Sequence, residues 1–165
     1  MAYSRLEDID WENWQAQQPA TLLFVVREGQ VLLIQKKRGL GAGKVNGPGG
    51  RLHNGEPPRQ GAIREVQEEL CVTPLGVEYG GELSFQFVDG LSIHVEVFRA
   101  SDCAGEPQET EEAVPLWTPL DQIPFEKMWA DDRYWIPLML ARQKFSGRFL
   151  FDGDTMLGYE IKIIP

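Results

Sequence analysis

The sequence predicts a single α/β domain in which helices pack against a β-sheet of mixed strand direction. The chain has 165 residues and is 42% hydrophobic, so it can bury one sizeable core but is too short for two full domains. Strand-like and helix-like stretches alternate along it without the regular rhythm of a doubly wound parallel sheet. The pattern is compatible with an α/β or an α+β sandwich, and we expect a mixed sheet in either case.

Three pairs of strand-like runs predict β-hairpins. Each pair has alternating or β-branched apolar residues on both sides of a short turn that contains glycine. A further strand-like run, which ends in a turn, spans residues 116–124. The predicted hairpins are residues 21–37 with a turn at Glu28-Gly29-Gln30, residues 76–100 with a turn at Asp89-Gly90, and residues 147–164.

Two stretches have the period of an amphipathic helix. Residues 56–70 place apolar side chains, including Val66 and Leu70, on one face, and residues 131–145 repeat apolar side chains at the same spacing. Between the first hairpin and the first helix, residues 38–50 contain six glycines and one proline. We expect a long functional loop there, because such a stretch is too flexible for a regular element.

Residues 1–18 are expected to form an N-terminal extension ahead of a single domain at residues 19–165. The first residues include Asp and Glu where a signal peptide has a basic and then an apolar stretch, and no apolar run approaches about 18 residues. We expect a short helix in the extension to pack Trp11 and Trp14 on the domain. A cytoplasmic protein with no membrane partner is therefore expected.

The charge of the chain argues against binding to polymeric nucleic acid. The 25 acidic and 16 basic residues give a formal net charge of −9, whereas a grip on a phosphate backbone needs many Lys and Arg. A small nucleotide held through a divalent cation is compatible with this charge. We expect a monomer with such a small-molecule substrate.

Cysteine and histidine residues show no metal-site pattern. Cys71 and Cys103 lack the spacing of a zinc site, and we expect both to be reduced and to pack as small buried side chains. His53 and His94 have no partner pattern and are interpreted as ordinary polar positions.

The first predicted helix places Glu65, Glu68 and Glu69 together on the face opposite its apolar residues. Like charges at these spacings destabilise a helix by a few tenths of a kcal/mol per pair. Solvent and the neighbouring Arg59 and Arg64 would offset this cost if the face were an ordinary exposed surface. A cation such as Mg²⁺ would also offset it, because Mg²⁺ prefers oxygen ligands shared between carboxylates and substrate phosphates.

The spacing of these acids resembles the Nudix box, whose pattern is Gly-x5-Glu-x7-Arg-Glu-apolar-x-Glu-Glu-x-Gly-apolar. Eight of its nine defined positions match this chain, and the ninth has Cys71 where the family has glycine. That glycine position follows the helix and often needs a left-handed backbone. The matching residues are Gly50, Glu56, Arg64, Glu65, Val66, Glu68, Glu69 and Val72.

The resemblance implies a Nudix-type α/β/α sandwich and hydrolysis of a nucleoside diphosphate linked to a further group, with Mg²⁺ as cofactor and Mn²⁺ as a substitute. It makes Glu65, Glu68 and Glu69 metal ligands, to which Gly50 adds a main-chain carbonyl. Arg64 would orient the neighbouring carboxylates, and Glu56 would support the junction between loop and helix.

The resemblance leaves the general base open. In related enzymes the base comes from the box helix, here Glu65 or Glu69, or from a glutamate on a distant loop. Glu112 matches the latter position, where it could also ligate the metal. Taken without the resemblance, Glu112 is an exposed loop acid beside Glu109 and Glu111.

Outside the box, residues 36–50 and 119–140 are similar to the mammalian-type MutT homologues, a branch of the family that hydrolyses oxidised purine nucleoside triphosphates. Leu40, Val45 and Pro48 depart from this branch, which has aromatics there, so we expect less stacking surface at the pocket mouth. The similarity implies that Asn46, Asp131 and Asp132 read the purine edge, that Trp129 stacks on the base, that Phe85 and Thr21 line the pocket floor, and that Lys36 contacts phosphate.

Purely structural roles for these residues also fit the sequence. Without the resemblance, Trp129 is a buried aromatic, and Asp131 with Asp132 is a helix N-cap.

The leading hypothesis is cleavage of 8-oxo-dGTP or 2-hydroxy-dATP to the monophosphate and pyrophosphate. Alternatives are hydrolysis of an undamaged nucleoside triphosphate, a dinucleoside polyphosphate or a nucleotide sugar, or a non-catalytic nucleotide-binding module. The last alternative is disfavoured because every acid of the box is present.

Overall fold

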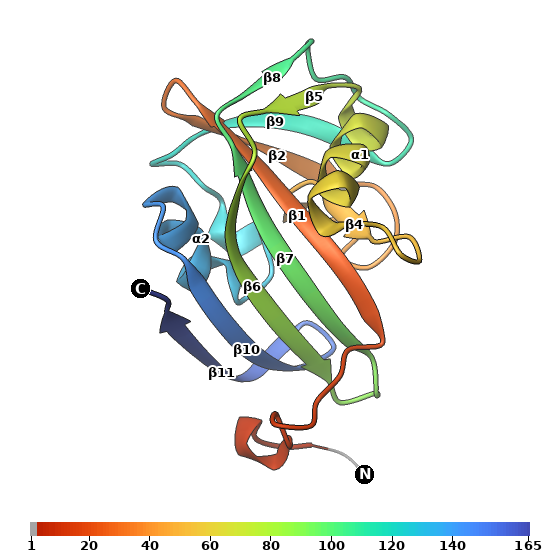
Figure 1. The fold of residues 1–165 in the computed structure, drawn as a ribbon, viewed down its shortest axis with the longest axis vertical. Coiled ribbons are helices and arrows are strands. Elements are labelled where there is room, and N and C mark those ends of the chain that lie inside the picture. The colour runs from red at the N-terminus through yellow and green to blue at the C-terminus, as the bar shows by residue number, and fades with distance from the viewer. Residues whose placement is uncertain (1–2) are drawn as a thin grey trace.

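A mixed nine-stranded sheet dominates residues 3–165, which are the part of the chain that the computed structural model describes (Figure 1). Two α-helices, α1 (Pro58–Leu70) and α2 (Asp132–Leu140), accompany it, with short 3-10 turns η1 (Leu6–Asp8) and η2 (Phe125–Lys127). The strands are β1 (Gln18–Arg27), β2 (Gln30–Lys36), β3 (Val45–Asn46), β4 (Gly49–Arg51), β5 (Thr73–Leu75), β6 (Glu78–Phe87), β7 (Ser92–Ala100), β8 (Asp102–Ala104), β9 (Ala113–Pro119), β10 (Phe145–Asp152) and β11 (Thr155–Ile163).

Side-chain alternation along β1 places the two helices on opposite faces of the sheet. Leu23 and Val25 belong to the cluster that packs against α1, whereas Phe24 and Val26 belong to the cluster that packs against α2. The parallel pairs β1 with β7 and β6 with β10 make the sheet mixed, since its other pairings are antiparallel. The predicted α/β/α sandwich with a mixed sheet is therefore confirmed.

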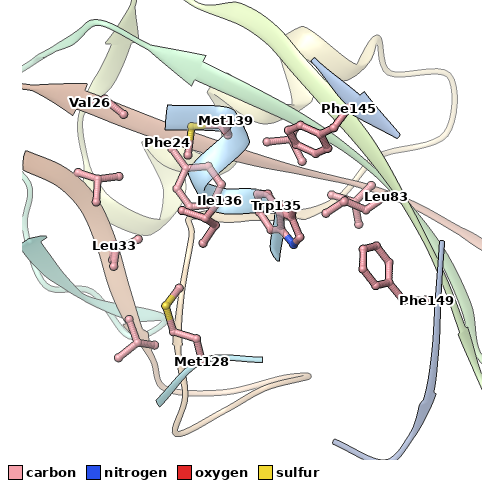
Figure 2. Packing of buried hydrophobic residues seen from close by; sticks show 14 of the residues in the cluster. Phe24, Val26, Leu33, Leu83, Met128, Trp135, Ile136, Met139, Phe145 and Phe149 are labelled. Carbon is pink, nitrogen blue, oxygen red and sulfur yellow. The ribbon is translucent and has the colours of Figure 1, made fainter. Parts of the chain in front are cut away.

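The larger core lies between α2 and the sheet. Trp135 of α2 is completely buried and meets Phe24 of β1 edge to face, with ring centroids 5.7 Å apart (Figure 2). Phe145 of β10 packs on the other side of Trp135. Each fully buried large apolar side chain contributes about 1.5–3 kcal/mol to folding, so this cluster holds α2 firmly on the sheet.

The three hairpins predicted from the sequence are present, but the glycine-rich stretch is more ordered than expected. It contains β3, which pairs with β2, and β4, which pairs Thr21 of β1 with Gly50. A Cβ on Gly49 would lie 2.0 Å from the carbonyl oxygen of Thr21. The absence of side chains therefore lets this backbone add to the sheet, which a search for apolar periodicity does not detect.

The second helix is shorter than the predicted residues 131–145. α2 ends at Leu140, Arg142 adopts φ 59°, and Phe145 already pairs with Gly81 in the sheet. Strand pairing thus ends the helical pattern. No helix within residues 3–165 has both the length and the apolar character needed to span a membrane.

The N-terminal extension packs at the end of the sheet away from α1 (Figure 1). Residues 1 and 2 of the predicted extension lie outside the described residues. Leu6 and Ile9 are buried against Leu150 of β10, and Trp11 and Trp14 pack against this cluster, so the predicted packing of both tryptophans on the domain is present. The short helix of the extension is the 3-10 turn η1.

Cys71 ends α1 in the left-handed conformation. Its φ and ψ are 62° and 29°, and its N–H donates to the carbonyl of Gln67 at 3.0 Å. The side chain is exposed, so the expectation that Cys71 packs as a buried residue is wrong, whereas Cys103 is buried as expected. The strain of a Cβ in this conformation amounts to about 1–2 kcal/mol.

Replacing Cys71 with glycine should therefore stabilise the protein. We expect Cys71→Gly to raise the free energy of unfolding by about 1 kcal/mol, because relief of left-handed strain exceeds the added entropy of the unfolded chain. Urea titration of the parent and the variant measures this change. Cys71→Ala, which keeps the Cβ, should give no such gain, and equal stabilisation by both variants would contradict the explanation.

Candidate active site

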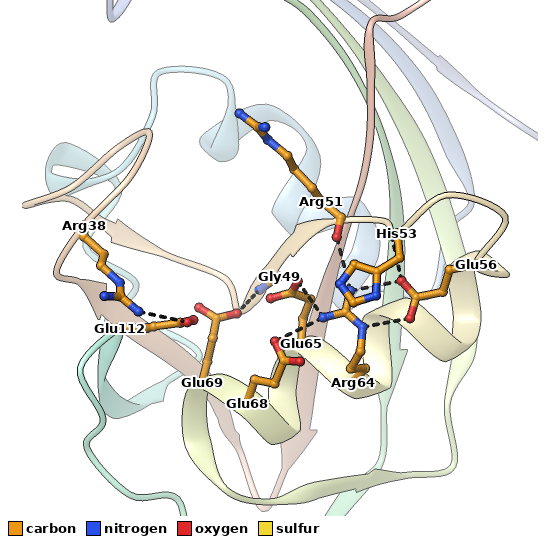
Figure 3. A network of polar contacts seen from close by, with 10 residues as sticks. All are labelled: Arg38, Gly49, Arg51, His53, Glu56, Arg64, Glu65, Glu68, Glu69 and Glu112. Carbon is orange, nitrogen blue, oxygen red and sulfur yellow. Dashed lines mark hydrogen bonds and ion pairs between the residues drawn. The ribbon is translucent and has the colours of Figure 1, made fainter.

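Arg64 organises the carboxylates along α1 (Figure 3). Its Nε and one terminal nitrogen donate to the two oxygens of Glu56 at 2.7 and 3.0 Å, while the other terminal nitrogen donates to Glu65 and Glu68 at 3.1 Å each. The Arg64 contacts and the N–H of His53 hold the pKa of Glu56 at about 2. Arg64 thus contacts the carboxylates that it was predicted to orient, and the roles predicted for Arg64 and Glu56 stay predictions.

Glu69 is the most buried acid of the helix, with 3% of its surface exposed. Its carboxylate accepts a hydrogen bond from the backbone N–H of Gly49 at 2.8 Å. Burial raises the pKa of Glu69 to about 8, against the opposing effect of this N–H, and the charges of Glu65 and Glu112 act in the same direction as burial. A buried carboxylate surrounded by like charges is a strong potential ligand for a cation.

The donor set suits a hard divalent cation. Glu65, Glu68 and Glu69 offer carboxylate oxygens, and Gly50 lets the backbone approach so closely that a Cβ there would lie 2.7 Å from the Glu65 carboxyl group. Within residues 3–165, no three acidic, histidine or cysteine side chains converge as an ion cage. Arg64 occupies one oxygen of Glu65 and one of Glu68, and joint ligation of an ion by Glu65, Glu68 and Glu69 stays a prediction.

Glu112 approaches the carboxylates from the loop before β9. Figure 3 shows its carboxyl group directed toward Glu69, and an oxygen of Glu112 lies 3.3 Å from a guanidinium nitrogen of Arg38. The hydroxyl of Thr110 fixes this loop, since it donates to the carbonyl of Glu69 and accepts from the N–H of Glu112. Glu112 is thus placed beside the acidic helix despite its distance in sequence.

A single cavity of about 390 Å³ joins the acidic end to an aromatic end. Glu65, Glu68 and Glu112 do not line it, so only part of the predicted metal site faces the cavity directly. Every residue predicted to bind substrate lines this cavity, together with two residues of the acidic end: Thr21, Lys36, Asn46, Phe85, Trp129, Asp131, Asp132, Gly50 and Glu69.

Lys36 and Thr21 bring polar atoms to the lining of the cavity. The ammonium group of Lys36 donates to the carbonyl of Leu40 at 2.6 Å, and burial lowers its pKa against the pull of Glu69. The hydroxyl of Thr21 is buried and has no hydrogen-bond partner among the described residues. A buried hydroxyl without a partner is costly unless a ligand supplies one.

Trp129 stands among aromatic side chains that the sequence did not assign to the site. Phe87 and Phe151 meet it edge to face at 6.2 and 5.6 Å, and both line the cavity. The spacing of Phe85 and Phe87, two apart on one strand, is the sequence signal that places both on one face. Lys44 lies 5.3 Å from the centre of the Trp129 ring.

The prediction of which residues form the pocket mouth is only partly correct. Leu40 lines the cavity and is 49% exposed. Val45 is instead buried in the main core, and Pro48 is buried where its carbonyl accepts from the N–H of Leu23. The prediction that all three residues shape the mouth is therefore wrong for Val45 and Pro48, because β3 and β4 turn them into the sheet.

Asp131 and Asp132 are buried at the start of α2 and line the cavity. Asp131 is the N-cap residue, but its side chain makes no cap hydrogen bond and accepts from the indole N–H of Trp135 at 2.7 Å. Burial raises the pKa of Asp131, and burial together with the charge of Asp131 raises the pKa of Asp132 well above 3.8. Simple helix capping therefore does not explain this pair.

The buried carboxyl of Asp132 should make stability depend on pH. Because its pKa is raised in the folded protein, folding is weakened as pH rises above the ordinary value of 3.8, and a neutral amide avoids this loss. We expect Asp132→Asn to stabilise the protein more at pH 7.5 than at pH 4.5 in urea titrations. An equal effect at both pH values would show that Asp132 carries its charge without cost.

Comparison with known proteins agrees with this geometry. The chain is 45% identical over 138 residues to the oxidized purine nucleoside triphosphate hydrolase of Danio rerio, covering 83% of this chain and 88% of the relative. The Mus musculus enzyme of the same name is 44% identical over 144 residues, covering 86% and 92%. The solved mutator MutT protein from Bacillus halodurans has 28% identity and a TM-score of 0.79, covering 88% and 97%. Since the model of the NUDIX domain matches residues 16–139, the chain belongs to the Nudix hydrolase family.

Proposed function

We propose that this protein cleaves oxidised purine nucleoside triphosphates, such as 8-oxo-dGTP and 2-hydroxy-dATP, to the monophosphate and pyrophosphate. The observation that carries the proposal is that one cavity is lined by the buried pair Asp131 and Asp132 together with Trp129 and also by the buried box glutamate Glu69. The names of the 44–45% identical relatives support the substrate class.

The setting of this activity is also part of the proposal. Residues 19–165 form the catalytic domain, with residues 1–18 as its extension. The protein acts as a monomer on free nucleotides in the cytoplasm, and not on polymeric nucleic acid. Its net charge of −9 supports this choice of substrate, because a long phosphate backbone would be repelled.

The aromatic end of the cavity can hold and read a purine. The indole ring of Trp129 can stack on a base, and edge-to-face contacts with Phe87 and Phe151 fix the orientation of that ring. Asp131 and Asp132 share a buried site in which one carboxyl can remain protonated and donate while the other accepts. If the proton moves between them, the pair can match two different oxidised bases without moving the backbone.

The acidic end can hold the phosphates and a divalent cation. Nudix hydrolases generally use divalent metals, and we propose Mg²⁺, which Mn²⁺ can replace, held by Glu65, Glu68, Glu69 and the carbonyl of Gly50, with Glu112 as a further ligand. When bound, Mg²⁺ would neutralise phosphate charge and lower the pKa of the attacking water. Arg64 keeps Glu65 and Glu68 in reach of this site, and Lys36 provides a cation toward the phosphates.

We propose that the base which accepts the proton of the attacking water is a glutamate of the box helix, Glu69 or Glu65, or Glu112. Glu69 lines the cavity, and Glu112 lies across from it on the loop before β9. The hydroxyl of Thr110 connects the backbones of the two residues, since it donates to the carbonyl of Glu69 and accepts from the N–H of Glu112. General-base catalysis by either one is worth about 10²–10⁴ in rate.

A substrate panel tests the proposed function. The parent should hydrolyse 8-oxo-dGTP with at least about tenfold higher kcat/KM than dGTP at saturating Mg²⁺, equivalent to about 1.4 kcal/mol in transition-state binding. The panel includes 2-hydroxy-dATP, dATP, a dinucleoside polyphosphate and a nucleotide sugar, with product release followed by chromatography. A smaller preference, or faster turnover of any unoxidised compound, would refute the proposal.

In the same assay, Glu112→Gln should lower kcat by about 10² or more if Glu112 is the base, and little if the base lies on α1.

A further inference from the structure

Trp14 links the N-terminal extension to a strand of the base pocket. Its indole N–H donates to Oε1 of Gln86 at 2.9 Å, although the two residues are 72 positions apart. Gln86 lies on β6 and is only 6% exposed. The NUDIX domain match begins at residue 16, so Trp14 lies outside the matched region.

Gln86 passes this contact on to both sides of the turn between β6 and β7. Its Nε2 donates to the carbonyl of Phe87 at 2.9 Å and to the carbonyl of Leu91 at 3.3 Å. The N–H of Phe87 also donates to the carbonyl of Leu91 at 2.8 Å. With the indole of Trp14 as its donor, the buried side-chain amide of Gln86 is therefore satisfied at both ends.

The turn held by Gln86 carries part of the base pocket. Phe87 and Leu91 both line the cavity, and the ring of Phe87 lies edge to face against Trp129. The acidic end of the cavity lies on other elements, since Glu69 belongs to α1 and Gly50 to β4. A change at Gln86 should therefore disturb the base end of the cavity more than the phosphate end.

The extension is anchored well enough to hold Trp14 in place. Leu6 and Ile9 are buried against Leu150, and the N–H of Gln17 donates to the hydroxyl of the buried Ser92 at 2.9 Å. These contacts fix the chain on both sides of Trp14. By contrast, the indole of Trp11 donates to the carbonyl of Leu6 within the extension itself.

We propose that Trp14 is a positioning residue for nucleobase binding, which acts through its hydrogen bond to Gln86 on the cavity-lining residues Phe87 and Leu91. This inference rests on the proposed function for the identity of the base. Loss of the bond leaves a buried amide oxygen without its donor, and that loosens the turn. The proposal predicts weaker nucleotide binding with unchanged chemistry.

Trp14→Phe tests the proposal because it removes the indole N–H and keeps an aromatic ring. We expect KM for 8-oxo-dGTP to rise about fivefold, the factor that corresponds to one buried acceptor left unsatisfied, with kcat within about twofold of the parent. Trp11→Phe is the matched control, because it keeps an aromatic ring beside Trp14, where the ring centroids are 5.3 Å apart, and loses only a hydrogen bond within the extension. It should leave both parameters unchanged. A fall in kcat without a rise in KM, or equal effects of both variants, would overturn the proposal.

A measurement without nucleotide separates this inference from the proposed function. In the unliganded protein, amide hydrogen exchange of residues 87–91 should be faster in Trp14→Phe and unchanged in Trp11→Phe. In a Gln86→Met background, Trp14→Phe should produce little further change in exchange or KM. Unchanged exchange in Trp14→Phe would refute the link even if 8-oxo-dGTP is the substrate. If the parent prefers another nucleotide, the proposed substrate fails, and KM for that nucleotide then tests Trp14.

Discussion

The hydrogen bond from the backbone N–H of Gly49 to the buried carboxylate of Glu69 is the contact on which the site depends. It fastens the glycine-rich segment to α1 at the point where that segment pairs with β1. The same pairing places Gly50 beside Glu65 and brings Thr21 to the cavity floor. A side chain at Gly49 would collide with the backbone of Thr21, so the contact requires glycine. Helix, sheet and cavity thus share one junction.

Burying acids at both ends of the cavity costs folding free energy, and the apolar core offsets that cost. Glu69, Asp131 and Asp132 all have pKa values raised by burial. The apolar clusters on the two faces of β1 hold α1 and α2, which carry these acids, in place. The protein therefore keeps ionisable groups out of water at the positions where a cation and a base edge could use them.

Much of the fold could be predicted from sequence because it depends on local spacing, whereas the residues of the candidate site came from the resemblance to the Nudix family. The alternation in residues 92–97 and the helical spacing of Val66 and Leu70 directly specify buried faces. The strands β3 and β4 were missed because glycine backbone pairing leaves no apolar pattern. Likewise, the end of α2 and the inward position of Val45 depend on pairing between distant segments. The contact between Trp14 and Gln86 crosses 72 positions and has no local signal.

The central claim is that base recognition and phosphate chemistry occupy separate ends of one cavity. Calorimetric binding of 8-oxo-dGMP to the parent, Glu69→Gln and Asp132→Asn in the absence of Mg²⁺ tests it most directly. The account predicts that Glu69→Gln binds like the parent, while Asp132→Asn binds about tenfold more weakly, a loss of about 1.4 kcal/mol. Equal affinity of Asp132→Asn and the parent, with weaker binding by Glu69→Gln, would contradict the account.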